Sequence, residues 1–224
     1  MLPTADRGRD TLLVFARAPR PGEVKSRLAA DIGDEEAARL YATMGRGIVK
    51  QVADGSYRTI VVHDPPEAGQ EIANWLGDLS YELRPQQVGD LGERLTAAIH
   101  DAFLESDRVV VIGTDSPEIT SAVIEEAFIR LHRCDLVIGP SFDGGFYLLG
   151  VTTPIPSLLR EVPWSSGNER EEVLRRARMR DLDIQQMSPR IDVDTVEDLE
   201  KLGTGTGVLI EAPRGTTPGG NPPA

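Results

Sequence analysis

TLLVFARAPRPGEVKSRL, residues 11–28, begins as an uninterrupted apolar run and continues into a loop rich in proline and basic residues. A continuous apolar run of this length is typical of a strand that is covered on both faces of a sheet. TIVV (59–62) and VVVI (109–112) have the same character. The three runs predict an α/β protein in which helices cover both faces of one sheet.

Strand-like runs alternate with helical runs along the rest of the chain. Strands are expected at 11–17, 57–64, 80–84, 108–113, 135–140, 145–151 and 183–187, and helices at 34–53, 67–77, 92–105, 120–132, 168–180 and 195–202. This order predicts a three-layer α/β/α sandwich around a Rossmann-like, mostly parallel mixed sheet. DGG at 143–145 joins two strands with no helix between them, which predicts a hairpin and some antiparallel pairing.

The composition limits the classes of function. The 224 residues suffice for one domain, expected at 11–202 between a flexible lead-in at 1–10 and a flexible Gly/Pro-rich tail at 203–224. A formal net charge of −12 argues against nucleic-acid partners and anionic membranes. The one cysteine excludes an internal disulfide. Because we find no apolar run of the ~20 residues that a membrane span needs and no signal peptide, we expect a cytoplasmic protein, with its oligomeric state open.

The loop after the first strand reverses the sign of this charge. Arg17, Arg20, Lys25 and Arg27 face a single acid, Glu23, within eleven residues. Cations and backbone N–H groups in such a loop suit a di- or triphosphate. The loop is not a Walker A motif, because valine stands where that motif has a glycine directly before Lys-Ser. The alternative is an exposed basic loop that balances an acidic surface.

Carboxylates follow at two later positions. Asp115 comes directly after an apolar strand, so we expect it at the carboxyl rim of the sheet, where a hard cation takes oxygen ligands. Asp192 and Asp194 are two residues apart in an extended segment and point to the same face. Asp194 could pair with Asp115 around one divalent ion. The alternatives are a turn or helix cap at Asp115 and a helix entry at Asp194.

Two further segments have both a structural and a functional interpretation. Asp143 precedes Gly144 and Gly145, a pattern typical of a hairpin turn and also of a backbone that a ligand approaches closely. Trp164 lies in the loop sequence VPWSSGN, where it either lines a pocket or packs into the core.

Six segments, in order, resemble one known family. They are FARAPRPGEVKSRL (15–28), PQQVGDLGERL (85–95), GTDSP (113–117), GPSFDGGFYLLG (139–150), VPWSS (162–166) and DVDTVEDL (192–199). Together they resemble the bacterial family of GT-A-fold glycosyltransferases that includes the arsenosugar-biosynthesis type. That family is similar to a wider nucleotide-diphospho-sugar transferase superfamily, which also contains phospholactate guanylyltransferases and molybdenum-cofactor nucleotidyltransferases.

The resemblance implies a GT-A fold, a bound Mg²⁺ or Mn²⁺ ion and a set of site residues. It places the nucleotide at Ala16, Arg17, Gly22, Lys25, Arg27, Gln87, Gly89, Thr114 and Asp115, the metal at Asp115 and Asp194, and the acceptor at Asp143, Gly144, Gly145 and Trp164. Lys25 and Arg27 would bind phosphates, and Asp143 would be the base for an acceptor hydroxyl. Two departures stand out: GTDSP has one aspartate instead of an Asp-x-Asp pair, and GDLG (89–92) replaces the Gly-Leu-Asn pattern of the guanylyltransferases.

Three hypotheses follow for the function. The main one is metal-dependent glycosyl transfer from a nucleotide diphosphate-sugar to a small-molecule acceptor. The alternative is nucleotidylyl transfer from a nucleoside triphosphate, of the phospholactate guanylyltransferase or molybdenum-cofactor type. The third is a nucleotide-binding module without turnover. The released product separates the first two, because glycosyl transfer releases a nucleoside diphosphate and nucleotidylyl transfer releases pyrophosphate.

Overall fold

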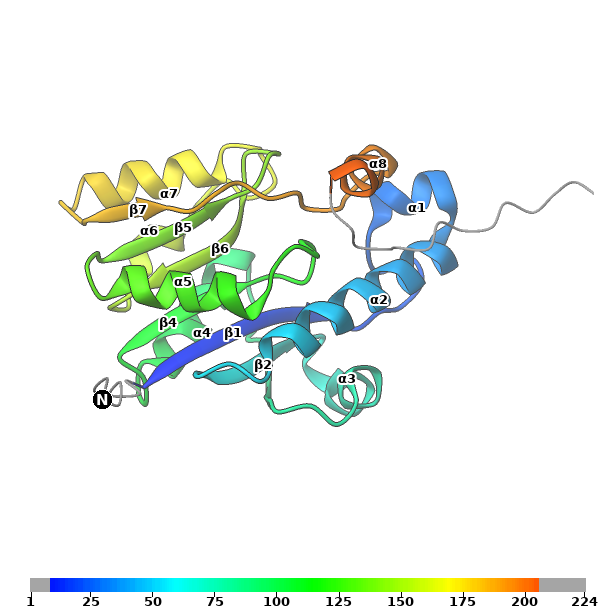
Figure 1. The fold of residues 1–224 in the computed structure, drawn as a ribbon, viewed down its shortest axis with the longest axis horizontal. Helices are drawn as coiled ribbons and strands as arrows, with labels where there is room; N and C mark the ends of the chain where they lie inside the picture. The colour runs from blue at the N-terminus through cyan, green and yellow to red at the C-terminus, as the bar shows by residue number, and fades with distance from the viewer. Residues whose placement is uncertain (1–8, 206–224) are drawn as a thin grey trace, which may run out of the picture.

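A computed structural model of the protein describes residues 9–205, in which seven strands form one sheet (Figure 1). The strands are β1 (Asp10–Arg17), β2 (Arg58–Asp64), β3 (Glu82–Pro85), β4 (Arg108–Ile112), β5 (Leu136–Pro140), β6 (Phe146–Val151) and β7 (Ile184–Gln186). They lie in the order β3-β2-β1-β4-β6-β5-β7. β6 is antiparallel to both of its neighbours, β4 and β5, and the other pairs are parallel.

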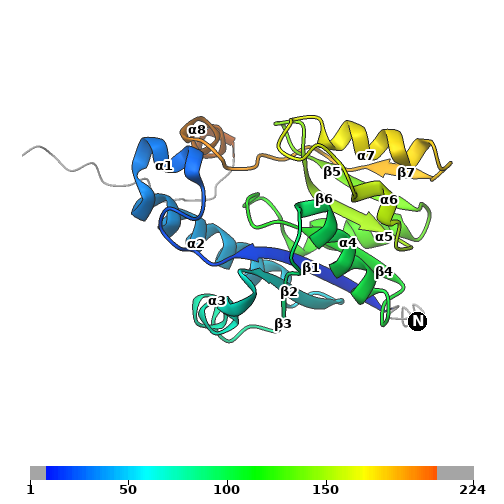
Figure 2. The ribbon, with the colours of Figure 1, turned by 180° about the vertical axis from the view of Figure 1, so that it is seen from behind.

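Helices cover both faces of the sheet. They are α1 (Ser26–Ile32), α2 (Asp34–Val52), α3 (Gly69–Leu76), α4 (Leu91–Ala102), α5 (Ser121–Leu131), α6 (Pro156–Leu159), α7 (Glu169–Arg178) and α8 (Val196–Gly205), with a 3₁₀ turn η1 at Pro66–Ala68. α2 and α5 lie in front of the sheet in Figure 1, and α4 and α6 lie in front in the reverse view of Figure 2. The three-layer α/β sandwich expected from the sequence is confirmed.

The alternation of side chains along β1 explains the two layers of core. Leu12 and Val14 belong to the buried cluster that also contains residues of α2, α3 and α5. Leu13 points to the opposite face and belongs to the cluster formed with α4, α6 and α7. All three leucine and valine side chains are at most 1% exposed. Because successive strand residues face opposite sides, an apolar run without alternation requires a cover on both sides.

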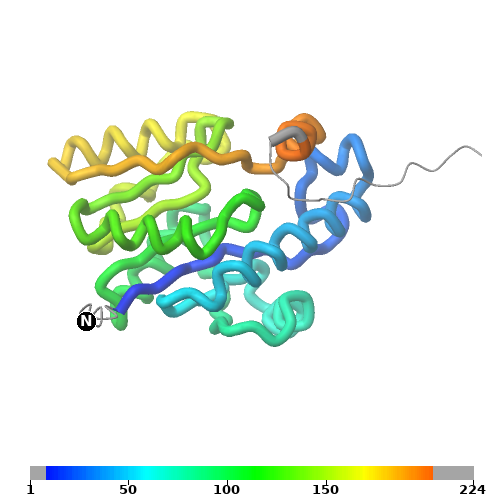
Figure 3. Tube along the Cα trace, in the orientation of Figure 1, coloured from blue at the N-terminus to red at the C-terminus, as the bar shows by residue number. Residues whose placement is uncertain are grey.

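The segment after β7 crosses the molecule and leads into α8, which lies beside α1 and α2 in the tube of Figure 3. Val193 and Leu202 are buried in one cluster with Met44 of α2. This packing brings residues near 194 to the end of the sheet where β1 stops. Within residues 9–205, no helix combines the length and the apolarity that crossing a membrane requires.

Most element positions agree with the sequence-based prediction, and the differences have local causes. The hairpin at 143–145 is confirmed, since β5 and β6 pair antiparallel. The predicted helices do not include α1 and α6, and the start of the helix predicted at 67–77 is the 3₁₀ turn η1. α1 has no side-chain cap at its start. α8 continues to Gly205, into the tail predicted from 203. The rest of that tail, and residues 1–8 of the predicted lead-in, lie outside the described residues.

Candidate functional site

The basic loop leaves β1 at its carboxyl end and is held in an unusual backbone conformation. Gly22 has φ +77°, a left-handed value that suits glycine. Lys25 also has a positive φ, 51°, which is uncommon for a residue with a Cβ, and α1 begins directly after it. Such conformations persist where surrounding contacts hold them, and here two carboxylates hold the Lys25 side chain.

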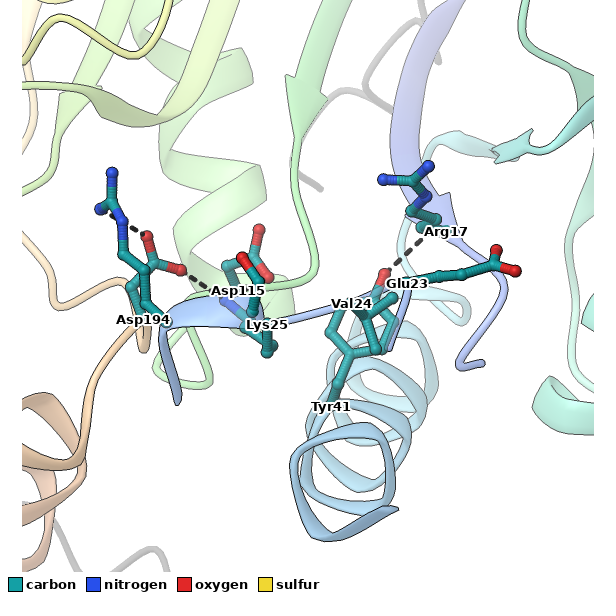
Figure 4. A pocket seen from close by; sticks show the side chains of 9 residues that line it. Arg17, Glu23, Val24, Lys25, Tyr41, Asp115 and Asp194 are labelled. Carbon is teal, nitrogen blue, oxygen red and sulfur yellow. Dashed lines mark hydrogen bonds and ion pairs between the residues drawn. The ribbon is translucent and has the colours of Figure 1, made fainter. Parts of the chain in front are cut away.

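Lys25 joins two aspartates that are far apart in the sequence (Figure 4). Its Nζ lies 2.7 Å from Oδ1 of Asp115 and 2.9 Å from Oδ1 of Asp194. Nη1 of Arg27 lies 3.5 Å from Oδ2 of the same Asp194. The structure therefore brings together the four residues that the sequence singled out for phosphate and metal binding.

Lys25 and the two aspartates differ in how much of each side chain is exposed to solvent. The Lys25 side chain is 5% exposed, whereas those of Asp115 and Asp194 are 45% and 39% exposed. Burial alone would lower the pKa of Lys25, but the two carboxylates outweigh it and hold the pKa above its usual value. Lys25 is therefore an ammonium ion at neutral pH, and the carboxylates beside it keep access to solvent.

Backbone hydrogen bonds fix Asp194 at the end of β4. The N–H of Val193 donates to the carbonyl oxygen of Asp115 at 2.9 Å. Immediately afterwards, the Asp198 carboxylate accepts from the N–H of Thr195 at 3.1 Å, and the N–H of Asp198 donates to the Thr195 hydroxyl at 3.4 Å. These reciprocal bonds form a capping box at the start of α8, in line with the helix entry considered for this segment from the sequence. Asp194 is thus placed by a strand-like contact on one side and a helix start on the other.

An open cavity of about 300 Å³ lies over this group. It is lined by Arg17, Glu23, Val24, Lys25, Ser26, Arg27, Tyr41, Asp115 and Asp194. The Tyr41 hydroxyl accepts the N–H of Arg17 at 2.9 Å and lies 2.9 Å from the Thr114 hydroxyl, behind the cavity (Figure 4). Burial raises the pKa of Tyr41 to about 12, so this hydroxyl remains a neutral support for the loop. Cations and solvent-facing carboxylates on one wall suit a phosphate chain with a divalent ion.

A larger cavity of about 570 Å³ adjoins the first, and Arg27, Asp115 and Asp194 line both. Apolar side chains form much of its wall: Phe15, Leu91, Leu95, Val111, Phe146 and Trp164. Trp164 therefore lines a pocket, and it also meets Phe146 edge-on at a ring distance of 6.2 Å. The volume and the mixture of apolar wall and few polar groups are typical of a small-molecule site.

Asp143 serves the hairpin and faces this larger cavity at the same time. Its Oδ1 accepts the N–H of Gly145 at 3.0 Å and the hydroxyl of Ser141. Within residues 9–205, its Oδ2 accepts no hydrogen bond, so one oxygen is left for a ligand. Gly144 has φ +96°, and a Cβ there would lie 2.0 Å from the carbonyl oxygen of Gly167. The turn is therefore packed directly against the segment before α7.

Asp192 also lines the larger cavity, and it accepts a hydrogen bond from the Ser116 hydroxyl. Burial raises the pKa of Asp192 to about 7; the Ser116 bond opposes this rise, and the nearby charges of Asp115 and Asp143 add to it. The sequence placed Asp192 and Asp194 on one face, and both do reach the same cavity.

Several residues expected near the nucleotide line neither cavity. These are Ala16, Gly22, Gln87, Gly89 and Thr114, and the same holds for Gly144 on the acceptor side. Gln87 and Gly89 are exposed in the loop before α4. Their neighbour Gln86 is the buried residue, with Nε2 donating to the carbonyl of Val62 at 3.0 Å and Oε1 accepting from Arg94 at 2.9 Å.

Among the site residues that were not found from the sequence, Tyr41 and Glu169 have clear structural roles. Tyr41 supports the basic loop, but it falls on the apolar face of α2 and gave no signal of its own. Glu169 lines the larger cavity, and its Oε1 accepts the N–H groups of Ser166 and Gly167 at 2.6 Å and 3.3 Å. The spacing Ser-x-x-Glu over 166–169 is a helix-start signature that would have identified it.

The residues present fit a divalent cation bound together with substrate. Within residues 9–205, no three His, Cys, Asp or Glu side chains form a ready-made metal site. Asp115 and Asp194 nevertheless offer solvent-facing oxygens on one wall of the 300 Å³ cavity. Mg²⁺ is commonly held by one or two carboxylates, with water and substrate phosphates completing its shell.

Comparison with known proteins relates the chain to a family and to individual proteins. Residues 48–166 match the model of a family described as "Uncharacterized protein conserved in bacteria (DUF2064)". The 2-phospho-L-lactate guanylyltransferase of Methanocaldococcus jannaschii is 28% identical over 181 residues, which cover 80% of this chain and 76% of that protein.

Solved structures share the fold. That of a proposed nucleotide-diphospho-sugar transferase from Desulfovibrio desulfuricans is 30% identical, covers 92% of each chain and has a TM-score of 0.85. A nucleotidyl transferase from Methanothermobacter is 17% identical with a TM-score of 0.61, covering 87% of this chain and 95% of that one. At that identity the likeness concerns the fold alone.

Proposed function

The chain belongs to the DUF2064 family of uncharacterized bacterial proteins, and we propose that this member is a metal-dependent nucleotidylyltransferase. It would move a nucleoside monophosphate from a nucleoside triphosphate to a small acceptor. The observation that carries the proposal is the junction of Lys25 with Asp115 and Asp194 beside Arg27, at the boundary of two cavities. The similarity to a guanylyltransferase over most of both chains supports it.

The two cavities give the reaction its two substrate sites. The 300 Å³ cavity, with Arg17, Lys25 and Arg27 on its wall, would hold the triphosphate. The 570 Å³ cavity would hold the acceptor. Asp115, Asp194 and Arg27 line both, so the α-phosphorus would lie near the boundary. Holding the two reactants next to each other supplies much of the rate enhancement expected of such an enzyme.

The chain's own residues would bind and orient the phosphates. Asp115 and Asp194 would hold Mg²⁺ or Mn²⁺, which when bound neutralises charge on the phosphate oxygens. Lys25 and Arg27 would bind the oxygens of the departing pyrophosphate and stabilise the negative charge that builds up on it. Asp143 would take the proton of an acceptor hydroxyl through its free Oδ2.

Glycosyl transfer, the main hypothesis from the sequence, remains as the second candidate. It is favoured by the similarity to the Desulfovibrio protein, a proposed nucleotide-diphospho-sugar transferase. The arsenosugar-biosynthesis type has no support from the comparisons. The same Lys25, Asp115 and Asp194 would then bind the diphosphate of a sugar nucleotide.

The released product decides between the candidates. Each of the four common nucleoside triphosphates, and separately a set of sugar nucleotides, is incubated with the protein, Mg²⁺ and a deproteinised metabolite extract. We expect pyrophosphate from one triphosphate, and at least a ~100-fold lower rate with Asp115→Asn, because losing ~3 kcal/mol of transition-state stabilisation has that effect. Asp54→Asn, at an exposed position outside both cavities, is the matched control.

Other outcomes contradict the proposal. Release of a nucleoside diphosphate from a sugar nucleotide, without pyrophosphate from any triphosphate, would identify glycosyl transfer. Saturable, Mg²⁺-dependent binding of a nucleotide with neither product would identify a binding module without turnover.

A further inference from the structure

We propose that the 570 Å³ cavity selects an acceptor with an apolar body and an uncharged or cationic head group, and rejects phosphomonoesters. The inference rests on the proposed function, because it assigns the chemistry of that reaction's second substrate. It separates this chain from the relative named for 2-phospho-L-lactate, whose acceptor carries a phosphate.

The charge around the cavity is strongly negative. Besides the partly buried Asp192, four carboxylates line it, from Asp115, Asp143, Glu169 and Asp194, against the single guanidinium of Arg27. Asp115 and Asp194 are already paired with Lys25, and Asp194 also with Arg27. The acceptor side therefore keeps the carboxylates of Asp143 and Glu169 with no lining cation beside them.

Two other cations, Arg170 and Arg190, pack near this region without lining the cavity. Arg170 lies 3.5 Å from the carboxylate of Glu171 and from the carbonyl of Ser141. Arg190 lies over the ring of Tyr147, 5.7 Å from its centre. A phosphate dianion beside Asp143 and Glu169 would therefore meet carboxylates, with Arg27 as the one basic side chain on the cavity wall. Like-charge contacts of this kind oppose binding.

The walls suit the opposite kind of ligand. Phe15, Phe146 and Trp164 give an aromatic lining, and Leu91 and Leu95 of α4 add aliphatic surface. Aromatic faces attract cations, and the attraction is stronger where water is excluded. A ring or short alkyl body that carries an ammonium or hydroxyl group would therefore match both the walls and the charge.

The reaction can be balanced with such an acceptor. A hydroxyl oxygen forms the new bond to the α-phosphorus, and the bond from that phosphorus to the bridging α–β oxygen breaks. Pyrophosphate leaves, and the hydroxyl proton passes to Oδ2 of Asp143, the oxygen that the hairpin leaves without a hydrogen bond within the described residues. The product is a phosphodiester instead of a diphosphate.

The selectivity can be measured by direct binding, without turnover. Trp75→Phe leaves Trp164 as the only tryptophan, since the chain has two. Its fluorescence is titrated with benzylammonium, benzyl alcohol and phenyl phosphate at constant ionic strength. We expect the Kd for phenyl phosphate to be at least ~10-fold higher than that for benzylammonium, a conservative value for like-charge repulsion.

A charge-neutral variant sharpens the test. Asp143→Asn keeps an oxygen for the hairpin bonds, and it should reduce the ratio of the two Kd values, whereas Asp54→Asn should leave the ratio unchanged. Binding of phenyl phosphate as tight as that of benzylammonium, an unchanged ratio in Asp143→Asn, or no response to any of the three probes would each overturn the inference. Failure of the proposed function appears separately, as absence of nucleotide-dependent pyrophosphate release.

Discussion

Lys25 lies where a divalent ion would also be stabilised, between oxygens of Asp115 and Asp194. An ammonium ion and a metal ion compete for such a position, since both are attracted by the same two carboxylates. When a nucleotide brings its own phosphates, Lys25 has an alternative set of oxygens to bind. Lys25 can therefore neutralise either the two carboxylates or the phosphates of a bound nucleotide.

Replacing this lysine should separate its two roles. In Lys25→Met we expect Mn²⁺ alone to raise the melting temperature more than it does in the unmodified protein, because the carboxylates lose their internal counter-ion. Affinity for the nucleoside triphosphate should fall ~10- to 100-fold, the effect of losing one or two charge-assisted hydrogen bonds. Thermal-shift titrations with Mn²⁺ and with nucleotide measure both quantities.

Lys50→Met is the matched control, since Lys50 is exposed near the end of α2 and lines neither cavity. It should change neither titration. A smaller Mn²⁺ effect in Lys25→Met than in the unmodified protein would show that the lysine supports metal binding instead of competing with it.

The sequence could identify some of these residues and not others. Lys25, Asp115 and Asp194 stand out because charged residues follow strands or precede a capped helix. Gln87 illustrates the opposite case, since its neighbour Gln86 is the buried one. In an irregular loop no periodicity tells which of two adjacent side chains points inward. Tyr41 gave no signal because it lies among the buried residues of α2, where an aromatic side chain is explained by packing alone.

At the scale of elements, the β5–β6 hairpin connects the acceptor side to the helix layer. Its turn approaches the segment before α7 so closely that a Cβ on Gly144 would lie 2.0 Å from the carbonyl oxygen of Gly167. Arg170, near the start of α7, donates its N–H to the carbonyl of Gly144 at 3.3 Å. Asp143 therefore depends on this contact for its position at the cavity.

Gly144→Ala should be strongly destabilising. The variant combines a left-handed backbone with a clash against a backbone oxygen, which together cost roughly 2–4 kcal/mol. Urea unfolding followed by circular dichroism measures the change. Gly47→Ala in α2 has no atom within 4 Å of the new Cβ, so it should be neutral or stabilise by up to ~1 kcal/mol. Equal stability of the two variants would contradict the packing described for the hairpin.

Long elements were easier to predict than short ones. The sequences of β1, β2 and β4 are continuously apolar, as expected for strands that helices cover on both faces of the sheet. The hairpin was readable from its Asp-Gly-Gly turn. α1 has seven residues and starts after a lysine in a left-handed conformation, without a cap hydrogen bond. Tertiary contacts of Lys25 fix that start, and such contacts cannot be read from local sequence.

At the scale of the whole molecule, the net charge of −12 acts on any anionic substrate. A nucleoside triphosphate is negatively charged and must approach a protein whose net charge is also negative. The basic side chains of the site, Lys25 and Arg27, are paired with acidic side chains. Screening of this repulsion by salt should help binding, the reverse of the behaviour of basic nucleotide-binding proteins.

Raising the salt concentration should therefore accelerate nucleotide association. We expect the association rate constant of the Mg²⁺–nucleotide complex to rise a few-fold between ~20 mM and ~150 mM NaCl, as the Debye length shortens to about 8 Å. Stopped-flow tryptophan fluorescence measures it, and an uncharged nucleoside should show no such dependence. A steep fall of the rate with salt would mean that the local field of the basic loop dominates over the net charge.

The C-terminal segment that carries Asp194 also has a consequence for protein synthesis. Lys25 and Asp115 are translated before the last strands of the sheet, whereas Asp194 is translated only after β7. Because chains begin to fold while they are being made, the sheet can assemble before its last acidic residue exists. Until the segment around Asp194 has been translated, a nascent chain would then carry a buried lysine with only half of its counter-charge.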